Sequence, residues 1–132
     1  METTVSANTL VIRKSEGSSD HIKLDYVAVK NAAMTLRAIN HKLRQQIVKL
    51  LEENKRMNVT DIYVKLRLEQ SVASQHLAIL RRANIVITER DGKFIHYALN
   101  HARIAAVAKF VNELVHSEVQ FIARYRSKRS SI

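Results

Sequence analysis

The stretch of sequence that decides the fold is Thr60–Leu99, TDIYVKLRLEQSVASQHLAILRRANIVITERDGKFIHYAL. It begins with a short amphipathic run, passes through the polar break Arg67–Glu69 and enters a second helical run rich in small polar side chains. Two β-prone runs follow, and Asp91-Gly92 between them is the strongest short hairpin signal available. This order predicts a helix-turn-helix with a β-hairpin directly behind it.

Helical periodicity continues on the N-terminal side of this segment. Apolar side chains at spacings of three and four residues predict one helix that begins after Asp25 and another that follows the Asn40-His41 break. In the second of these helices, Arg44 is expected on the outer side. The residues expected to face inward are Leu43, Ile47, Leu50 and Leu51.

The helix-turn-helix itself is predicted as a short helix capped by Asn58 or Thr60, followed by a helix over residues 70–83. Asn84 is expected to take the left-handed conformation that more often belongs to Gly. A long last helix is predicted over residues 101–124. The fold class is therefore mainly α-helical with a β-hairpin wing, a winged helix-turn-helix.

The ends of the chain have a different composition from its centre. Residues 1–22 are rich in Ser and Thr and are predicted to form a flexible arm. Within that arm, Thr9–Arg13 is β-prone and either pairs with an exposed strand edge or frays, and fraying is favoured. The winged domain is predicted over 23–125. Three alternatives are open for the basic tail 126–132: it extends the last helix, it wraps DNA, or it is a disordered or frayed end, and the last is favoured.

Charge and cysteine content limit the possible functions. The 132 residues carry a formal net charge of +10, which points to an acidic polymer or surface as partner. The absence of Cys excludes disulfides, thiolate metal sites and thiol redox sensing. Neither a signal peptide nor an apolar run of bilayer-crossing length is recognisable, so we expect a cytoplasmic protein without a membrane partner.

The helix predicted over 70–83 carries the most specific chemical signal. The major groove of double-stranded DNA accepts one α-helix, and Gln and Ser side chains can both donate to and accept from base edges. A helix cap and a solvent-facing position are the alternative roles for the two serines. The candidate base-reading residues are Gln70, Ser71, Ser74 and Gln75.

Basic and imidazole side chains surround these positions. Arg90 and Lys93 lie at the predicted hairpin tip, where contact with DNA phosphates is the better interpretation. Arg81 lies near the end of the helix predicted over 70–83, here called the reading helix, where it reaches phosphates or solvates the helix terminus. His76 has two equally supported roles, donation to a phosphate or half-buried support of its own helix. These four residues are the candidate contacts to the DNA backbone.

Three segments in order resemble the ArsR-type (ArsR/SmtB) winged-helix transcriptional repressors. Residues 36–44, LRAINHKLR, resemble the family pattern L-x-x-x-S-H-P-x-R, with Asn40 and Lys42 departing from it. Residues 71–80 resemble the recognition helix pattern S-x-x-S-x-H-L-x-x-L, and residues 85–99 resemble the wing. Asn84 stands where the family usually has Gly.

The resemblance implies a homodimer that pairs through its terminal helices and binds successive major grooves, with repression lifted by an effector. The last predicted helix agrees, because it is apolar over more of its surface than a lone surface helix leaves exposed. The candidate dimerisation residues are Tyr26, Val29, Ile104, Val107, Val111, Leu114 and Ile122.

The family's metal-sensing sites are not reproduced in this sequence. His101 matches one ligand position on the last helix, but Arg103, Leu114 and Ser117 stand at the others. A single histidine beside a cation and a hydrophobic residue makes a poor metal site. We therefore predict no metal and no cofactor, and the effector is unknown.

The functional prediction is a sequence-specific DNA-binding transcriptional regulator, a homodimeric repressor. The alternative is a winged-helix module that docks protein without binding DNA, and the polar, neutral-to-basic face over 70–82 argues against it. An enzyme is not expected, because no nucleophile–base pair, phosphate-cradling glycine loop or paired catalytic carboxylates can be found.

Overall fold

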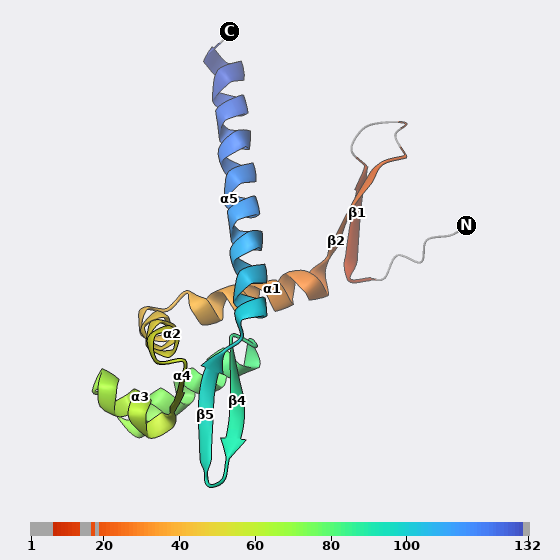
Figure 1. The fold of residues 1–132 in the computed structure, drawn as a ribbon. Helices are drawn as coiled ribbons and strands as arrows, with labels where there is room; N and C mark the ends of the chain where they lie inside the picture. Colours follow the sequence, from red (N-terminus) through yellow and green to blue (C-terminus); the bar gives the residue numbers. More distant parts are fainter. Residues whose placement is uncertain (1–6, 14–16, 18, 131–132) are drawn as a thin grey trace.

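The computed structural model describes residues 7–13, 17 and 19–130, and for residues 118–130 it describes the backbone alone. Figure 1 shows the elements in chain order. Their bounds are β1 (Thr9–Arg13), β2 (His21–Asp25), α1 (Tyr26–Ile39), α2 (Lys42–Asn54), β3 (Arg56–Asn58), α3 (Val59–Leu66), α4 (Gln70–Arg82), β4 (Val86–Asp91), β5 (Phe94–Leu99) and α5 (His101–Ser130). The predicted winged helix-turn-helix fold is confirmed.

Side-chain caps fix where the first helices begin. Asp25 accepts a hydrogen bond from the backbone N–H of Val27 at 2.9 Å and caps α1, as its position predicted. Of the two candidate caps for α3, Asn58 serves, since its Oδ1 accepts from the Asp61 N–H at 2.8 Å. After α4, Asn84 has φ +60°, which confirms its predicted left-handed conformation.

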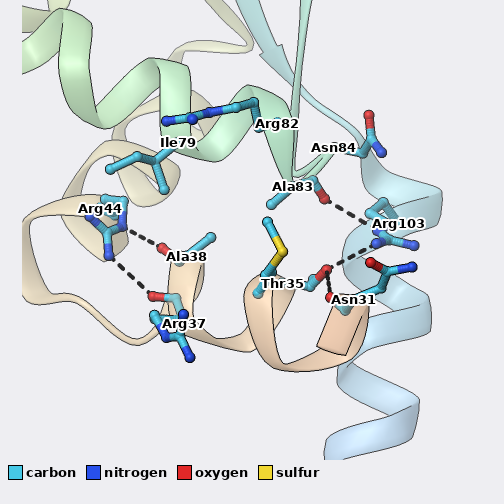
Figure 2. Close-up of a pocket in the computed structure, with 11 residues that line it drawn as sticks. Asn31, Thr35, Arg37, Ala38, Arg44, Ile79, Arg82, Ala83, Asn84 and Arg103 are labelled. Atoms are coloured by element: carbon cyan, nitrogen blue, oxygen red, sulfur yellow. Dashed lines mark hydrogen bonds between the residues drawn. The ribbon is translucent and has the colours of Figure 1, made fainter. Parts of the chain in front are cut away.

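Arg44 bridges the break between α1 and α2, and its position differs from the prediction. Its side chain is buried at 8% exposure. The Nε group donates to the Ala38 carbonyl at 2.6 Å and Nη2 donates to the Arg37 carbonyl at 3.1 Å, as Figure 2 shows. The outward placement was wrong because the unpaired carbonyls at the end of α1 provide acceptors that make burial of the guanidinium tolerable.

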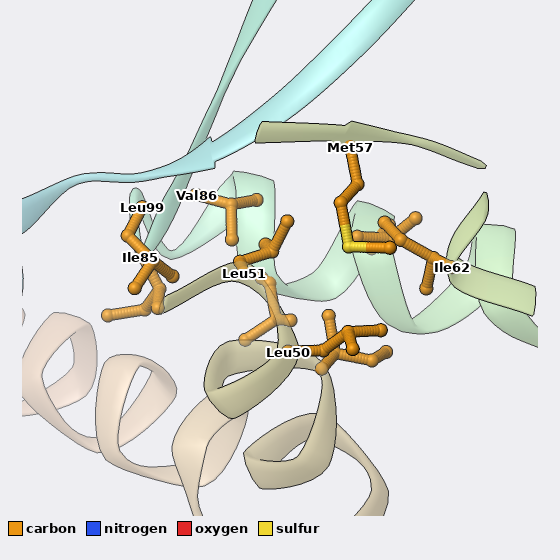
Figure 3. Packing of buried hydrophobic residues seen from close by; sticks show 10 residues of the cluster. Leu50, Leu51, Met57, Ile62, Ile85, Val86 and Leu99 are labelled. Carbon is orange, nitrogen blue, oxygen red and sulfur yellow. The ribbon is translucent and has the colours of Figure 1, made fainter. Parts of the chain in front are cut away.

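The core lies between α2, α3, α4 and the wing sheet (Figure 3). Apolar side chains from both helices of the helix-turn-helix meet α2 and the bases of the strands. Ile104 and Val107, at the start of α5, pack against the edge of this cluster. The fully buried side chains of largest volume are Ile47, Leu51, Ile62, Leu77, Leu80, Ile85 and Val86. This packing fixes α4 relative to the wing.

The wing is part of an antiparallel sheet in the order β3-β5-β4. The sequence analysis did not predict β3, which pairs Met57 with Tyr97 and turns the hairpin into a three-stranded sheet. The tip is shifted by one residue from the prediction, because Asp91 pairs with Phe94 and leaves Gly92 and Lys93 as the loop. Gly92 has φ +63° at the first loop position, where type II′ hairpin turns favour Gly.

The predicted flexible arm needs correction in its described part. β1 and β2 form an antiparallel hairpin instead of a frayed end, and Leu10 pairs with Leu24 and Ile12 with Ile22. Strand alternation places these four apolar side chains on one face of the ribbon, where cross-strand pairs stabilise the hairpin. The predicted boundary at residue 22 therefore falls inside β2, and residues 1–6, 14–16 and 18 of the arm lie outside the described residues.

α5 is longer than predicted and projects away from the wing (Figure 1). It continues to Ser130, so residues 126–130 extend the helix and are not the frayed end that the sequence favoured. Residues 131–132 lie outside the described residues. No helix in the described part of the chain is long and apolar enough to cross a membrane.

Candidate nucleic-acid interface

The N-terminal half of α4 presents a polar face. The four candidate base-reading residues, Gln70, Ser71, Ser74 and Gln75, all have exposed side chains. The opposite side of the helix is anchored in the core by the buried residues Ala73, Leu77 and Leu80. The core thus holds α4 by one side and leaves the Gln/Ser face free to contact a partner.

A tight turn sets the angle between α3 and α4. Arg67 adopts the left-handed conformation with φ +56°, and the Leu68 N–H donates to the Tyr63 carbonyl at 2.9 Å. Glu69 takes the N-cap position of α4 but makes no side-chain cap hydrogen bond. Ser71 is the second residue inside α4 and is not its N-cap, so the cap position that was one of the alternatives for it belongs to Glu69.

His76 lies between the polar face of α4 and the core. It is half-buried, and its Nδ1 atom lies 3.2 Å from Nη1 of Arg44. Because a guanidinium can only donate, His76 Nδ1 must accept, and the neutral ring then carries its proton on Nε2. His76 thus supports its own helix through Arg44, which is one of the two roles that the sequence left open. Its Nε2–H remains as a further donor.

The surroundings of His76 disfavour its charged form. Burial lowers its pKa, and the nearby His41 and Arg44 lower it further. The His41 ring lies 4.9 Å from the His76 ring between centroids, and His41 Nδ1 also caps α2 by accepting from the Leu43 N–H at 3.2 Å. These contacts link the start of α2 to the middle of α4.

The wing presents two cations without carboxylate partners in the described part of the chain. The Arg56 guanidinium lies 3.9 Å from a Glu89 carboxylate oxygen and 3.6 Å from an Asp91 carboxylate oxygen, so it forms ion pairs with both acidic residues of β4. Strand alternation puts these acids on the face opposite Arg90, which shares a face with buried Val86. Arg90 and Lys93 are exposed and form none of the ion pairs.

The other candidate residues are placed as follows. Arg81 is exposed in the last turn of α4. Tyr26, Val29, Val111 and Leu114 are exposed on α1 and α5, whereas Ile104 and Val107 are partly covered by the core of their own chain. The side chain of Ile122 lies outside the described residues.

The predicted absence of a metal stays a prediction. His101 Nε2 lies 3.5 Å from a Glu52 carboxylate oxygen. Among the residues that the structure describes, no three His, Cys, Asp or Glu side chains gather as a metal site would require.

Sequence reasoning missed two residues that organise this region. Arg44 precedes Ile47 and Leu51 by three and seven residues, so helical spacing alone would have placed it on the buried face. Arg103 joins α5 to α1 and to the C-cap of α4 through contacts that only the folded chain brings together. Its Nη2 donates to Thr35 Oγ1 at 3.0 Å and its Nε to the Ala83 carbonyl at 3.3 Å.

Known proteins with similar sequences match this chain over most of its length. Residues 41–88 match the family model described as "Bacterial regulatory protein, arsR family". The transcriptional repressor PagR of Bacillus anthracis is 34% identical over 95 residues, which span 72% of this chain and 94% of PagR. The transcriptional activator HlyU of Vibrio cholerae is 32% identical over 83 residues, which span 63% of this chain and 76% of HlyU.

Solved structures show the same relationship. The crystal structure of PagR aligns with a TM-score of 0.55 at 32% identity, over 66% of this chain and 99% of the PagR chain. An ArsR-like transcriptional regulator from Rhodococcus sp. RHA1 aligns with a TM-score of 0.65 over 76% of this chain and 94% of that chain, and at 16% identity it supports the fold alone. The chain belongs to the arsR family of bacterial regulatory proteins, a family of winged helix-turn-helix transcriptional regulators and not of enzymes.

Proposed function

We propose that this regulator binds double-stranded DNA as a homodimer and reads base sequence with the exposed face of α4. The observation that carries the proposal is the joint exposure of Gln70, Ser71, Ser74 and Gln75 on a helix whose other side is buried. Ser71 and Gln75 are one turn apart, which brings both to the same strip of a groove. Gln can bond adenine with two hydrogen bonds, and Ser can bond either edge of a base.

Residues around α4 are proposed to contact the phosphates. Arg90 and Lys93 are suited to this because their charges are not neutralised by the acids of the wing. Arg81 extends the basic surface along α4. His76 is proposed to donate through Nε2–H, since Arg44 occupies its other ring nitrogen. Such contacts position the protein without carrying sequence information.

The homodimer is proposed to form through α1 and α5. Both helices expose apolar side chains that a single copy leaves in water, including Tyr26 and Val29 on α1 and Val111 and Leu114 on α5. Two copies would then place two reading helices about 34 Å apart, one turn of duplex, so the binding site should consist of two inverted halves.

We further propose that binding represses transcription, in the cytoplasm, where the chromosome of a bacterium is accessible. Repression is supported by PagR, the more similar of the two named relatives, which is a transcriptional repressor. Activation, the direction named for HlyU, is the alternative. A protein-docking role is disfavoured because the described α4 carries no acidic side chain and its exposed face is polar.

The reading helix is tested with a double variant, Ser71→Ala with Gln75→Ala. A binding site is first selected from a random duplex library, and affinity is then measured by fluorescence anisotropy for that site and for a scrambled duplex. Losing both side chains should reduce the preference for the selected site by at least tenfold, because each good base contact contributes about 1–3 kcal/mol of discrimination. Gln46→Ala, an exposed glutamine on α2, is the matched control and should leave the preference unchanged. An unchanged preference in the double variant would refute this assignment.

The wing is tested with Lys93→Ala in the same assay. Loss of a phosphate contact should weaken binding to both duplexes alike and should lower the salt dependence, log K against log [salt], by about one unit of slope. A variant that weakens binding to the selected site alone would instead show that Lys93 reads bases.

A further inference from the structure

A pocket with a volume of about 490 Å³ lies where α1, the C-terminal half of α4 and the start of α5 meet (Figure 2). This volume is within the range of roughly 300–1,000 Å³ that small-molecule sites occupy. The predicted reading face of α4 begins at the other end of that helix, so the pocket is separate from the proposed base-reading residues.

Four arginines from four helices line this pocket. They are Arg37 on α1, Arg44 on α2, Arg82 on α4 and Arg103 on α5. Among the residues that the structure describes, no Asp or Glu lines the pocket. Within the described part of the chain, none of the four arginines has a carboxylate oxygen within the 4.0 Å of an ion pair. Four cations around one cavity are thus left without an anion.

One of these arginines, Arg44, is held through all of its nitrogen atoms, and the other three retain free donors. Within the described residues the Arg37 side chain makes no hydrogen bond. All three nitrogen positions of Arg44 are used, by the Ala38 and Arg37 carbonyls and by His76. Arg103 uses Nε and Nη2 and keeps Nη1. Arg82 donates only through Nε, to the Ala78 carbonyl at 3.4 Å. Arrays of fixed and free guanidinium donors are suited to carboxylate and phosphate groups, which they bind through paired hydrogen bonds.

The remaining wall is partly apolar. Met34, Ala38 and Ile79 line the pocket beside the arginines. An inorganic anion would leave this surface uncovered, whereas a molecule with an apolar body would cover it and gain from its burial.

We propose that the pocket binds a small organic anion, and that the free donors of Arg37, Arg82 and Arg103 supply the contacts to its carboxylate or phosphate group. Its apolar body lies against Met34 and Ile79. A DNA phosphate is a poorer candidate, because it carries no apolar body to cover Met34 and Ile79.

Occupancy of the pocket is further proposed to weaken DNA binding, and this step rests on the proposed function. The pocket joins α4 to α1 and α5, so a bound anion contacts the reading helix and both proposed dimerisation helices at once. It also neutralises cations that contribute to attraction of the DNA polyanion. By linkage, DNA must weaken anion binding by the same factor.

The site is tested by calorimetric titration of the full-length protein, without DNA, with four probes. 2-Naphthoate and 2-naphthyl phosphate carry the anion and an apolar body, 2-naphthamide lacks the charge and inorganic phosphate lacks the body. We expect one saturable site per chain for one or both naphthyl anions and at least tenfold weaker binding of the other two probes. Absence of saturable binding by both naphthyl anions would overturn the proposal, as would equal binding of the amide or of inorganic phosphate.

Variants locate the site. Arg37→Gln and Arg82→Gln should each raise the dissociation constant of the bound probe about tenfold, since each removes one charge-assisted contact. Lys109→Gln removes one charge from an exposed position on α5 that does not line the pocket, and should leave the constant unchanged. Equal behaviour of Arg82→Gln and Lys109→Gln would show that the anion binds elsewhere.

The coupling is tested by DNA anisotropy with the binding probe at saturation. Affinity for the selected duplex should fall about tenfold in the wild-type protein and much less in Arg82→Gln. An unchanged DNA affinity would overturn the coupling. A protein that fails to bind DNA without any probe would refute the proposed function instead, and the titration without DNA would still decide the site.

Discussion

Arg44 makes clear what a single side chain contributes to this fold. Its guanidinium joins the end of α1, the body of α2 and the middle of α4 through three acceptors. The helical spacing of Arg44 predicts a buried position, whereas its charge predicts an exposed one. Burial is possible only because the folded chain supplies three acceptors, and these come together only after α1 has ended and α4 has packed beside it. Helical stripes could therefore predict the apolar core but not this buried polar contact.

His76 makes stability depend on pH in a definite direction. Its pKa is lowered in the folded chain, chiefly by burial. Below the ordinary value of about 6.5, the unfolded chain therefore binds a proton that the folded chain resists, and stability falls as pH decreases through this range. The protonated ring would also lose Nδ1 as an acceptor for Arg44.

We expect His76→Gln to remove this contribution while its side-chain oxygen still accepts from Arg44. The urea midpoint of wild-type protein should fall further between pH 7.5 and pH 5.5 than that of the variant, by equilibrium unfolding followed by circular dichroism. Equal decreases in the two proteins would show that His76 does not contribute to the pH dependence.

The elements differ in how far the sequence could predict them. α1 to α4 were predictable because their apolar stripes and caps agree, as with Asp25 before α1 and Asn84 after α4. β3 has three residues, too few to show alternation. The β1–β2 hairpin depends on pairing between Leu10 and Leu24, and the one-residue shift at the wing tip depends on register. Pairing partners of this kind are specified by the whole sheet and not by one strand.

The N-terminus of α3 allows a test at the scale of one element, because the sequence left two candidates, Asn58 and Thr60, for the residue that caps it. Asn58→Ala should lower the free energy of unfolding by about 1 kcal/mol, the usual effect of losing a side-chain cap. Thr60→Ala, the matched alternative within the same first turn, should change it by less than about 0.5 kcal/mol, as exposed substitutions usually do. Chemical denaturation of both variants decides between them, and a larger loss for Thr60→Ala would contradict the observed cap.

The whole molecule has two ends with different surfaces. The wing and the helix-turn-helix form one end, and α5 projects from the other (Figure 1). Ile104 and Val107 pack α5 on the core at its start, but Phe110, Val111, Leu114 and Val115 are exposed further along. A helix of 30 residues with an exposed apolar stripe gains most of its stability from packing, which a second copy can supply.

The dimer is tested by placing charges on that stripe. Val111→Lys with Leu114→Lys should convert a protein with the mass of two chains into one with the mass of a single chain, by sedimentation equilibrium. The DNA affinity of the single chain should fall at least 100-fold, because each half-site is then bound without the linked second half. Ala105→Lys with Asn112→Lys adds the same two lysines on the side of α5 away from the stripe, at 100° per residue, and should remain dimeric. A wild-type mass of one chain, even with duplex present, would contradict a dimer and with it the expectation of two inverted half-sites.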